Sequence, residues 1–484
     1  MCGAMVCAMK GERIVNWHLD RPEPKLPLSY FWTWDHSTNW VLDDPGLQAT
    51  GCNNAYLKKP ETFVEDYRRL TDMTAALGIR GIVIWGFLRD SHGGVELAKR
   101  VAGYAASKGV AIMPGLGTTY YGGPYYEGDH PYSLAAFARK HPDAVAHDAQ
   151  GRPGSGLCAA HPAFADWLAE GVRWLYDEFD IGGINLENGD YMVDHNPLML
   201  ELQKDWPKDD PVIFANQAVS YRIALEAIAD RLDETLGAYA TYTGFVPAKV
   251  PAGASRSAYG YVMDCDRPAM FDVLPAGGIC QWTISSMMRR RPLRLSDYMD
   301  DGSPAAAFDN DLWPADLAPP VRHVRSVGFV HQPSQWSGGP TKLGRYQQLV
   351  SVIKEACLRS HRAGLRGVSI HGEVTAGYVP WALNYLAFSH FTHWPEDTMR
   401  QFAAKTLAPV LGNEREAQEF MELFAHYDSG AFTEADARLA KERDDAYRGQ
   451  AARGRKEAIE TYRMWHWLHC VGTGQHETET VSFF

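Results

Sequence analysis

The chain has 484 residues, of which 45% are hydrophobic and 12% aromatic, so it can build a large core and is not a disordered protein. Its formal net charge of -12 is spread without long runs of one sign, which excludes the basic footprint of a nucleic-acid or anionic-membrane binder. No stretch reaches the roughly 18 consecutive apolar residues of a membrane span, so no membrane partner is expected.

Residues 1–27 are predicted to be a lead-in that precedes the first strand. The segment Met1–Lys10 is too short and poorly flanked for a secretory leader, so the chain is expected to be cytoplasmic, or periplasmic or secreted if a leader was removed. The eight cysteines include no C-x-x-C pair, and neither a disulfide framework nor a metal site or cofactor is expected. The basic cluster at 289–294 is interpreted as an exposed loop.

An amphipathic helix followed by a short apolar strand recurs along the chain. In residues 61–77 the apolar side chains repeat at three- and four-residue steps, Gly78 ends the helix, and the run 79–87 follows as a buried strand. The same pattern recurs in 164–187 and 343–371. Adding the other apolar runs gives eight strands, near 28–34, 79–87, 110–116, 182–187, 236–242, 276–284, 326–331 and 365–371.

This alternation predicts an α/β fold, a (β/α)8 TIM barrel over residues 28–380 with long loops after its strands. A doubly wound open sheet is the main competitor, but no strand is followed by a G-x-G-x-x-G turn. After residue 380 only helices are predicted, at 382–392, 396–411, 413–427 and 433–467. Residues 381–484 are therefore expected to form a helical region that packs on the barrel.

Aromatic and polar residues gather directly after five or six of the predicted strands, where a TIM barrel builds its site. Sugars present apolar C–H faces and a ring of hydroxyls, so a site that combines flat rings with hydrogen-bonding groups suits a carbohydrate. The candidate substrate-binding residues are Trp34, His36, Asn39, Trp40, Trp85, Arg89, His92, Tyr120, Tyr121, Asn185, Tyr242, Trp282, His331, Gln332, Trp336 and His371.

Two glutamates close predicted barrel strands and are the leading catalytic candidates. Glu187 ends the fourth strand and Glu373 follows the eighth, and strands four and eight stand opposite each other in an eight-stranded barrel. Glycoside hydrolysis commonly uses two carboxyl groups that flank the scissile bond. Glu187 is therefore predicted to be the general acid/base and Glu373 the second carboxylate, with Asp190 and Asp35 in reserve; a structural pairing of Glu373 with an arginine is the competing interpretation.

At this point the chain resembles the superfamily of barrel glycoside hydrolases over roughly residues 28–425. The resemblance lies in Leu157–Pro162, in the Asn-x-Glu end of strand four, and in Asn384–Leu386 followed by Trp394–Asp397. The last two are similar to the C-terminal helices of exo-acting α-glucuronidases and β-hexosaminidase-like enzymes. The chain departs from the largest retaining clan, which has adjacent Asn-Glu after strand four, and from hexosaminidases, which have an adjacent Asp-Glu pair.

The resemblance implies a glycosidase that acts on an oligo- or polysaccharide, in an exo or short-chain mode, with its pocket walled by the tyrosine-rich loop 118–130. Two alternatives stay open. One is a polysaccharide lyase in which Tyr120, Tyr121 or His331 removes a proton from a uronate while Arg89 neutralises its carboxylate. The other is a carbohydrate-binding barrel without catalytic activity. The sequence does not set the oligomeric state.

Overall fold

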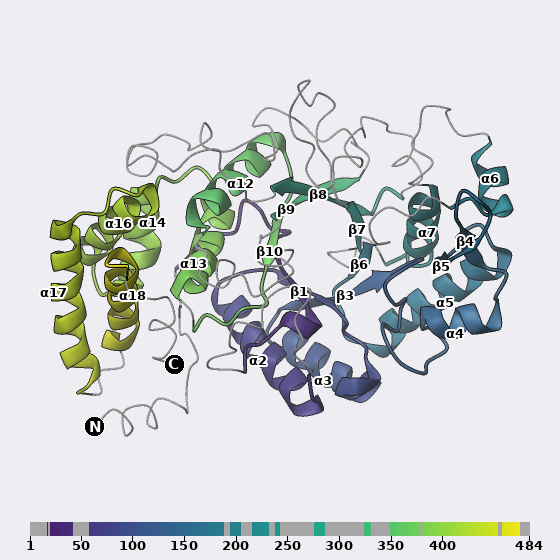
Figure 1. The fold of residues 1–484 in the computed structure, drawn as a ribbon, viewed down its shortest axis with the longest axis horizontal. Helices are drawn as coiled ribbons and strands as arrows, with labels where there is room; N and C mark the ends of the chain where they lie inside the picture. Colours follow the sequence, from purple (N-terminus) through teal and green to yellow (C-terminus); the bar gives the residue numbers. More distant parts are fainter. Residues whose placement is uncertain are drawn as a thin grey trace.

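The computed structural model describes residues 17, 20–41, 58–187, 194–204, 215–231, 238–242, 275–285, 324–330, 349–377, 379–453 and 457–474 (Figure 1). The side chains of 238–242 and 282–285 are not among the described parts. Outside the described residues lie the predicted site residues Asp190, His331, Gln332 and Trp336 and the basic cluster at 289–294.

Eight parallel strands pair in a ring, in the order β1-β10-β9-β8-β7-β6-β3-β2, so that the order returns to β1. Their bounds are β1 Tyr30–Trp34, β2 Gly81–Trp85, β3 Ala111–Gly117, β6 Ile184–Glu187, β7 Ala238–Tyr242, β8 Ile279–Ser285, β9 Arg325–Val330 and β10 Val368–His371. These are the eight predicted strand positions, and they confirm the α/β class and the parallel sheet. The complete eight-fold repeat of strand and helix stays a prediction, because 243–274 and 286–323 lie outside the described residues.

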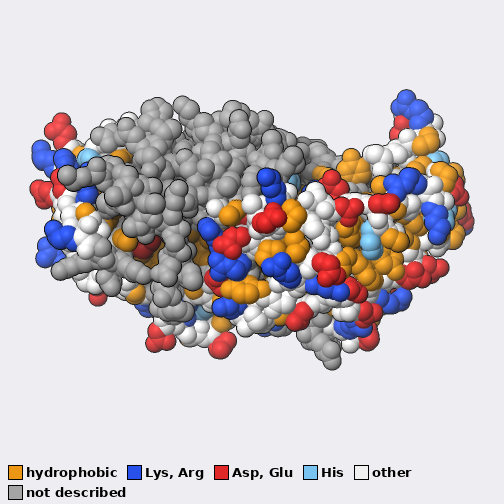
Figure 2. All heavy atoms as spheres, turned by 90° about the horizontal axis from the view of Figure 1, so that it is seen from below, with side chains coloured by type: hydrophobic (Ala, Val, Ile, Leu, Met, Phe, Trp, Pro, Cys, Tyr) orange, Lys and Arg blue, Asp and Glu red, His pale blue; other side chains and the backbone are white. Residues whose placement is uncertain are grey.

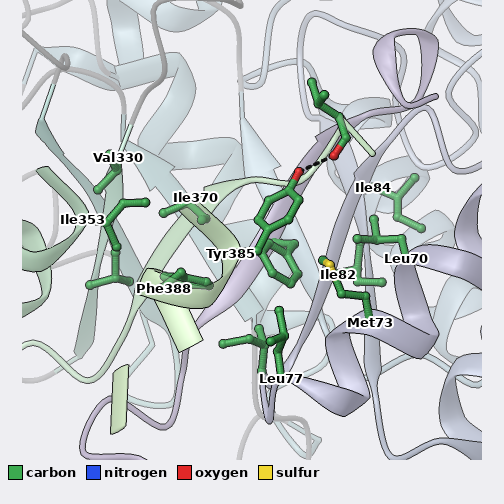
Figure 3. Packing of buried hydrophobic residues seen from close by; sticks show 14 of the residues in the cluster. Leu70, Met73, Leu77, Ile82, Ile84, Val330, Ile353, Ile370, Tyr385 and Phe388 are labelled. Atoms are coloured by element: carbon green, nitrogen blue, oxygen red, sulfur yellow. Dashed lines mark hydrogen bonds between the residues drawn. The ribbon is translucent and has the colours of Figure 1, made fainter. Parts of the chain in front are cut away.

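Alternate residues of each strand face opposite sides of the sheet, and both sides are apolar. The inner side carries a cluster rich in large rings, made of Leu28, Tyr30, Trp32, Trp34, Val83, Trp85, Met113, Ile279, Val327 and Phe329. The outer side packs on helices. Figure 3 shows this outer packing, with Ile82 and Ile84 against Leu70, Met73 and Leu77, and with Ile370 near Phe388 and Ile353.

The first α-helices that the structure describes after β1, β2, β9 and β10 are α2 Pro60–Ala76, α3 Gly94–Ser107, α12 Val350–Ala363 and α13 Val379–His393. The remaining helices on the β3 and β6 side are α4 Leu134–Lys140, α5 Pro162–Glu178, α6 Pro197–Gln203 and α7 Ala215–Glu226. Helix α2 shows how the local sequence sets the two ends of a helix. Proline at its first position fits the helical φ, and Gly78 at φ +65° lets the chain leave the helix in the left-handed conformation.

A two-stranded antiparallel sheet, β4 Val145–His147 with β5 Pro153–Leu157, was not expected from the sequence. Its strands are short and its outer residues are exposed, so they lack the apolar run or the strict alternation that marks a strand. Asp148 and Gly151 form the turn, in which the Gly151 N–H donates to the Asp148 carbonyl at 2.9 Å. This hairpin leads directly into the 157–162 segment before α5.

Helix α13 is buried along its whole length, between the barrel and the C-terminal helices. On one side Tyr385 packs edge-to-face on Phe31 of β1, with ring centroids 5.2 Å apart. On the other side His390 lies 2.8 Å from the Thr406 hydroxyl, within the π-helix Ala403–Leu407. The sequence-based boundary at residue 380 thus falls inside an element that packs on both parts, although the division into regions remains a prediction.

The C-terminal helices are α14 Met399–Phe402, the π-helix, α15 Ala408–Leu411, α16 Glu414–Ser429, α17 Glu434–Ala451 and α18 Glu457–Gly472. The prediction of one helix over 433–467 is wrong, because the chain forms two helices that pack side by side (Figure 1). Gly454, a poor helix former, lies between them in the sequence, and Asp444 of α17 pairs with His466 of α18 at 3.0 Å.

The described surface mixes charges of both signs. Figure 2 shows Lys and Arg side chains interspersed with Asp and Glu on the face seen from below. Among the described helices, none has the length and apolar character needed to cross a membrane. The four described cysteines, Cys158, Cys280, Cys357 and Cys470, are buried, and burial raises the pKa of Cys158 to about 12.

Candidate active site

Glu187 and Glu373 lie on opposite walls of the barrel. Glu187 ends β6, Glu373 follows β10 by two residues, and four steps separate β6 from β10 in either direction around the strand order. Asn185 and His371, two residues earlier on each strand, contact side chains of the inner cluster. Because side chains alternate along a strand, Glu187 and Glu373 belong to the same inner side. Both are buried, at 6% and 3% exposure.

The carboxylate of Glu373 is held from two directions. The backbone N–H of Trp34 donates to its Oε1 at 3.1 Å, and Nδ1 of His371 lies 3.4 Å from its Oε2. The Glu373 carbonyl also accepts from the Asn39 backbone N–H at 3.0 Å. Burial, together with the Glu373 charge, also raises the pKa of the Tyr385 phenol well above its usual value. The orientation of Glu373 is thus set by backbone as well as side chains.

Glu187 sits beside the loop that follows β3. Its carbonyl accepts from the Thr118 backbone N–H at 3.0 Å, which joins the ends of β3 and β6. Burial raises the pKa of Tyr126 to about 12, and the Glu187 charge adds to this rise. The phenol of Tyr126 is therefore a neutral group within electrostatic range of the Glu187 carboxylate.

Asn185 joins three strands below the two glutamates. Its Oδ1 accepts from the indole N–H groups of Trp85 at 2.8 Å and Trp32 at 3.3 Å, and its Nδ2 donates to Gln281 Oε1 at 3.3 Å. Asn185 is completely buried, so this candidate substrate-binding residue forms part of the floor below the site. Trp85 reaches this position because Gly115 opposite has no side chain; a Cβ there would lie 2.4 Å from the indole.

Aromatic rings surround this floor on the β1–β3 side of the barrel. Trp34 packs on Trp85 and Tyr121, with centroid distances of 5.3 and 6.1 Å, and on His36 at 5.6 Å. Tyr126 packs edge-to-face on Trp85 at 6.4 Å. The structure thus brings together the predicted residues Trp34, His36, Trp85, Tyr120 and Tyr121, since Tyr120 contacts Tyr121 at 5.0 Å.

The tyrosine-rich loop 118–130 is fastened to the segment after β2. Arg89 pairs with Glu127 and stacks over the Tyr126 ring at 4.5 Å, and Asp90 accepts from the Tyr125 hydroxyl. Backbone N–H groups of Tyr126 and Glu127 both donate to the Leu88 carbonyl at 3.1 Å. These contacts hold the loop in place beside the site. They also pair the Arg89 guanidinium with Glu127.

Asp35 and His92 face away from the inner side, toward α2. Asp35 Oδ2 lies 3.2 Å from His92 Nε2, and its Oδ1 lies 3.8 Å from Lys58 Nζ. These positive and donor groups outweigh burial and lower the pKa of the Asp35 carboxyl. Both residues belong to a buried charge cluster outside the strands. Trp40 also lies on this outer side, where its indole donates to the Gly372 carbonyl at 2.8 Å and its ring stacks on Tyr385.

Tyr126 and Gln281 contact residues of the site, and Tyr385 lies within electrostatic range of Glu373. The sequence-based selection of site residues included none of these three. Gln281 carries a usable signal, because a polar residue inside an apolar strand needs a partner, and Asn185 is that partner. Tyr126 follows the selected Tyr120 and Tyr121 in the same loop. Tyr385 has no local signal, since it lies within a helix. The side chains of Tyr242 and Trp282 are outside the described parts.

Among the described residues, no group of three or more His, Cys, Asp and Glu side chains is placed to hold a metal ion. No protein-family model matches the chain, and no curated protein matches it.

Several solved structures resemble the chain. A GH138 enzyme targeting pectin rhamnogalacturonan II shares 13% identity at a TM-score of 0.44, covering 87% of this chain and 55% of that one. A maltogenic α-amylase, AmyB from Thermotoga neapolitana, shares 10% identity at a TM-score of 0.41, covering 77% of each chain. A β-N-acetylhexosaminidase from Bacteroides fragilis NCTC 9343 shares 15% identity at a TM-score of 0.36, covering 76% and 66%.

The chain spans about half the length of the first of these structures and of an α-L-fucosidase isoenzyme from Paenibacillus thiaminolyticus, at 55% and 49% of their chains.

Proposed function

We propose that the chain is a TIM-barrel glycoside hydrolase that acts on an oligo- or polysaccharide through Glu187 and Glu373. The observation that supports this most is the placement of two buried carboxyl groups on opposite walls of an aromatic barrel interior. A glycosidic bond lying between them has one carboxyl group available to its leaving oxygen and another to its anomeric carbon or to an attacking water.

The surroundings of the two glutamates differ, and this difference supports separate roles. Glu373 is oriented by the Trp34 backbone N–H and by His371, as a nucleophile or water-activating base has to be. Glu187 lies within electrostatic range of the Tyr126 phenol, whose pKa is raised to about 12. This phenol stays neutral and does not exchange its proton with the Glu187 carboxyl group. In the proposed reaction Glu187 gives its proton to the glycosidic oxygen, the C–O bond breaks, and Glu373 attacks the anomeric carbon or deprotonates water.

The test is hydrolysis of a panel of nitrophenyl glycosides by the native chain and by Glu187→Gln and Glu373→Gln. Each substitution should lower turnover by about a thousandfold, because each removes an acid/base or nucleophilic group. Glu416→Gln is the matched control, since Glu416 is a buried glutamate of the C-terminal helices. Native-like activity in Glu187→Gln would eliminate the proposed mechanism.

Product analysis separates the other two classes of function. A lyase gives an unsaturated product that absorbs in the ultraviolet, a hydrolase gives a new reducing end, and a binding barrel gives neither. The lyase interpretation needs Arg89 for a uronate carboxylate, whereas this guanidinium already contacts Glu127 and the Tyr126 ring. The geometry therefore favours hydrolysis over elimination.

A further inference from the structure

Three tryptophans line the inner side of β1 and β2, and their indole N–H groups are not equally satisfied. Asn185 accepts from the indoles of Trp32 and Trp85. The indole nitrogen of Trp34 has no hydrogen-bond partner among the residues that the structure describes, although Trp34 is only 7% exposed. A buried donor without an acceptor is unfavourable. Among the described tryptophans Trp17, Trp34 and Trp465 carry such a donor, and of these three Trp34 alone belongs to the inner cluster of the barrel strands.

Trp34 is also the residue that touches Glu373. Its backbone N–H donates to the carboxylate at 3.1 Å, so the Trp34 backbone lies beside one of the two proposed catalytic groups. Its ring contacts Trp32, Trp85 and Tyr121 within the inner cluster. The unsatisfied donor therefore belongs to the region where a substrate has to lie between the two glutamates.

The residue that packs on Trp34 from the β3 loop has an uncommon backbone. Tyr121 has φ +58°, and it is the one non-glycine residue with positive φ in the described part of the chain. The left-handed conformation is unfavourable for a residue with a bulky side chain, and it concentrates at functional sites. The turn depends on Gly117, where a Cβ would lie 1.8 Å from the Tyr120 carbonyl oxygen. A strained turn thus brings the Tyr121 ring to Trp34.

We propose that Trp34 and Tyr121 form a sugar subsite beside Glu373, in which the indole N–H of Trp34 donates a hydrogen bond to a hydroxyl oxygen of the bound sugar. This inference rests on the proposed glycosidase function and specifies how one sugar unit is held. Since the donor is buried, a sugar without an acceptor at that position leaves it unsatisfied and binds less well. Trp34 therefore determines sugar specificity through its indole N–H, in addition to offering an apolar surface.

Trp34→Phe removes the donor and keeps an aromatic ring. Trp465→Phe is the matched control, because Trp465 of α18 is also buried, with an indole nitrogen that lacks a partner among the described residues, and lies among rings such as Phe420. We expect Trp34→Phe to lower kcat/KM for hydrolysed glycosides by about tenfold, the effect of losing one hydrogen bond, while Trp465→Phe leaves it unchanged.

A second measurement follows the indole N–H itself in the chain with isotope-labelled tryptophan. Methyl glycosides of glucose, galactose, fucose, N-acetylglucosamine and glucuronic acid are added in turn, and the Trp34 resonance is assigned from its absence in Trp34→Phe or, if that variant does not fold, in Trp34→Tyr. At least one sugar should shift the Trp34 resonance and leave that of Trp465 in place.

The outcomes separate the two proposals. If a glycoside is hydrolysed with dependence on Glu187, yet no sugar shifts the Trp34 resonance and Trp34→Phe keeps native kcat/KM, the subsite is wrong and the glycosidase function stands. If a sugar shifts the Trp34 resonance without any hydrolysis, the subsite stands and the catalytic function is wrong. If neither hydrolysis nor a shift occurs with any sugar, both are wrong.

Discussion

Lys58 and Asp66 form an ion pair in which both side chains are almost completely buried, at 2% and 0% exposure. Asp35, equally buried, lies 3.8 Å from the same ammonium group. One cation therefore serves two carboxyl groups, and burial raises the pKa of Asp66 to about 6 in spite of it. This cluster joins the end of β1 to α2 and supports the strand end from which Trp34 contacts Glu373.

Lys58→Met should destabilise the protein by about 3–5 kcal/mol, because it leaves the buried Asp66 carboxyl group without its cation. Chemical denaturation measures the change. Lys99→Met is the control, since Lys99 pairs with Glu178 at the surface with both side chains more than a third exposed, and its loss should change the free energy of unfolding far less than the loss of Lys58 does. Equal effects of the two substitutions would contradict the role given to the buried cluster.

His393 should make the stability depend on pH. Burial lowers the pKa of this imidazole from 6.5 to about 4, so the fold favours its neutral form. The resulting stabilisation is present above about pH 6.5 and is lost as the pH falls through about 4. His393→Gln should reduce the loss of stability on acidification, measured as the difference between the denaturation free energies of the two proteins. Parallel pH profiles would show that His393 does not contribute.

Asn185→Leu should destabilise the barrel by at least about 2 kcal/mol, because it removes the acceptor of two buried indole N–H groups and the partner of Gln281. Denaturation gives the free energy, and near-ultraviolet circular dichroism reports the tryptophan environment. In the background of Trp85→Phe the same substitution should be less damaging, since one of the donors is gone. If the losses of unfolding free energy caused by Asn185→Leu and Trp85→Phe simply add in the double variant, the proposed hydrogen-bond network around Asn185 is wrong.

Gly115→Ala should destabilise the protein by about 1–3 kcal/mol, because the new Cβ would overlap the Trp85 indole and displace it. Gly103→Ala provides the contrast. Gly103 lies inside α3 with open space around it, and alanine there should stabilise the helix by about 0.5–1 kcal/mol. The measurement is thermal or chemical denaturation of both variants, together with their rates on the best glycoside.

Much of the fold could be predicted because most strands are short apolar runs, and several of them, such as β2, β3 and β6, follow closely on a glycine after a helix end. Counting those strands was enough to place Glu187 and Glu373 on opposite walls, as the observed strand order bears out. The single helix over 433–467 was wrong because the segment between α17 and α18, Ala452–Lys456, carries one glycine and no proline, which is a weak signal for a break.

The sequence was a poorer guide to which side of the sheet each strand-end residue faces. Phe31 and Thr33 face outward while Trp32 and Trp34 face inward, yet both sides are buried, so hydropathy does not distinguish them. Asp35 continues the outward set and meets Lys58 instead of the site. The partnership of Asn185 with Gln281 joins residues 96 positions apart, and such pairing requires the closed sheet.

The complete burial of α13 has a practical consequence for dissecting the chain. A fragment that stops after this helix would expose to water the surface that now meets Phe402 and Thr406. Such a fragment would tend to aggregate, and a low yield from it would say nothing about the barrel's chemistry. Expression work on this protein should therefore keep the barrel and its C-terminal helices on one polypeptide.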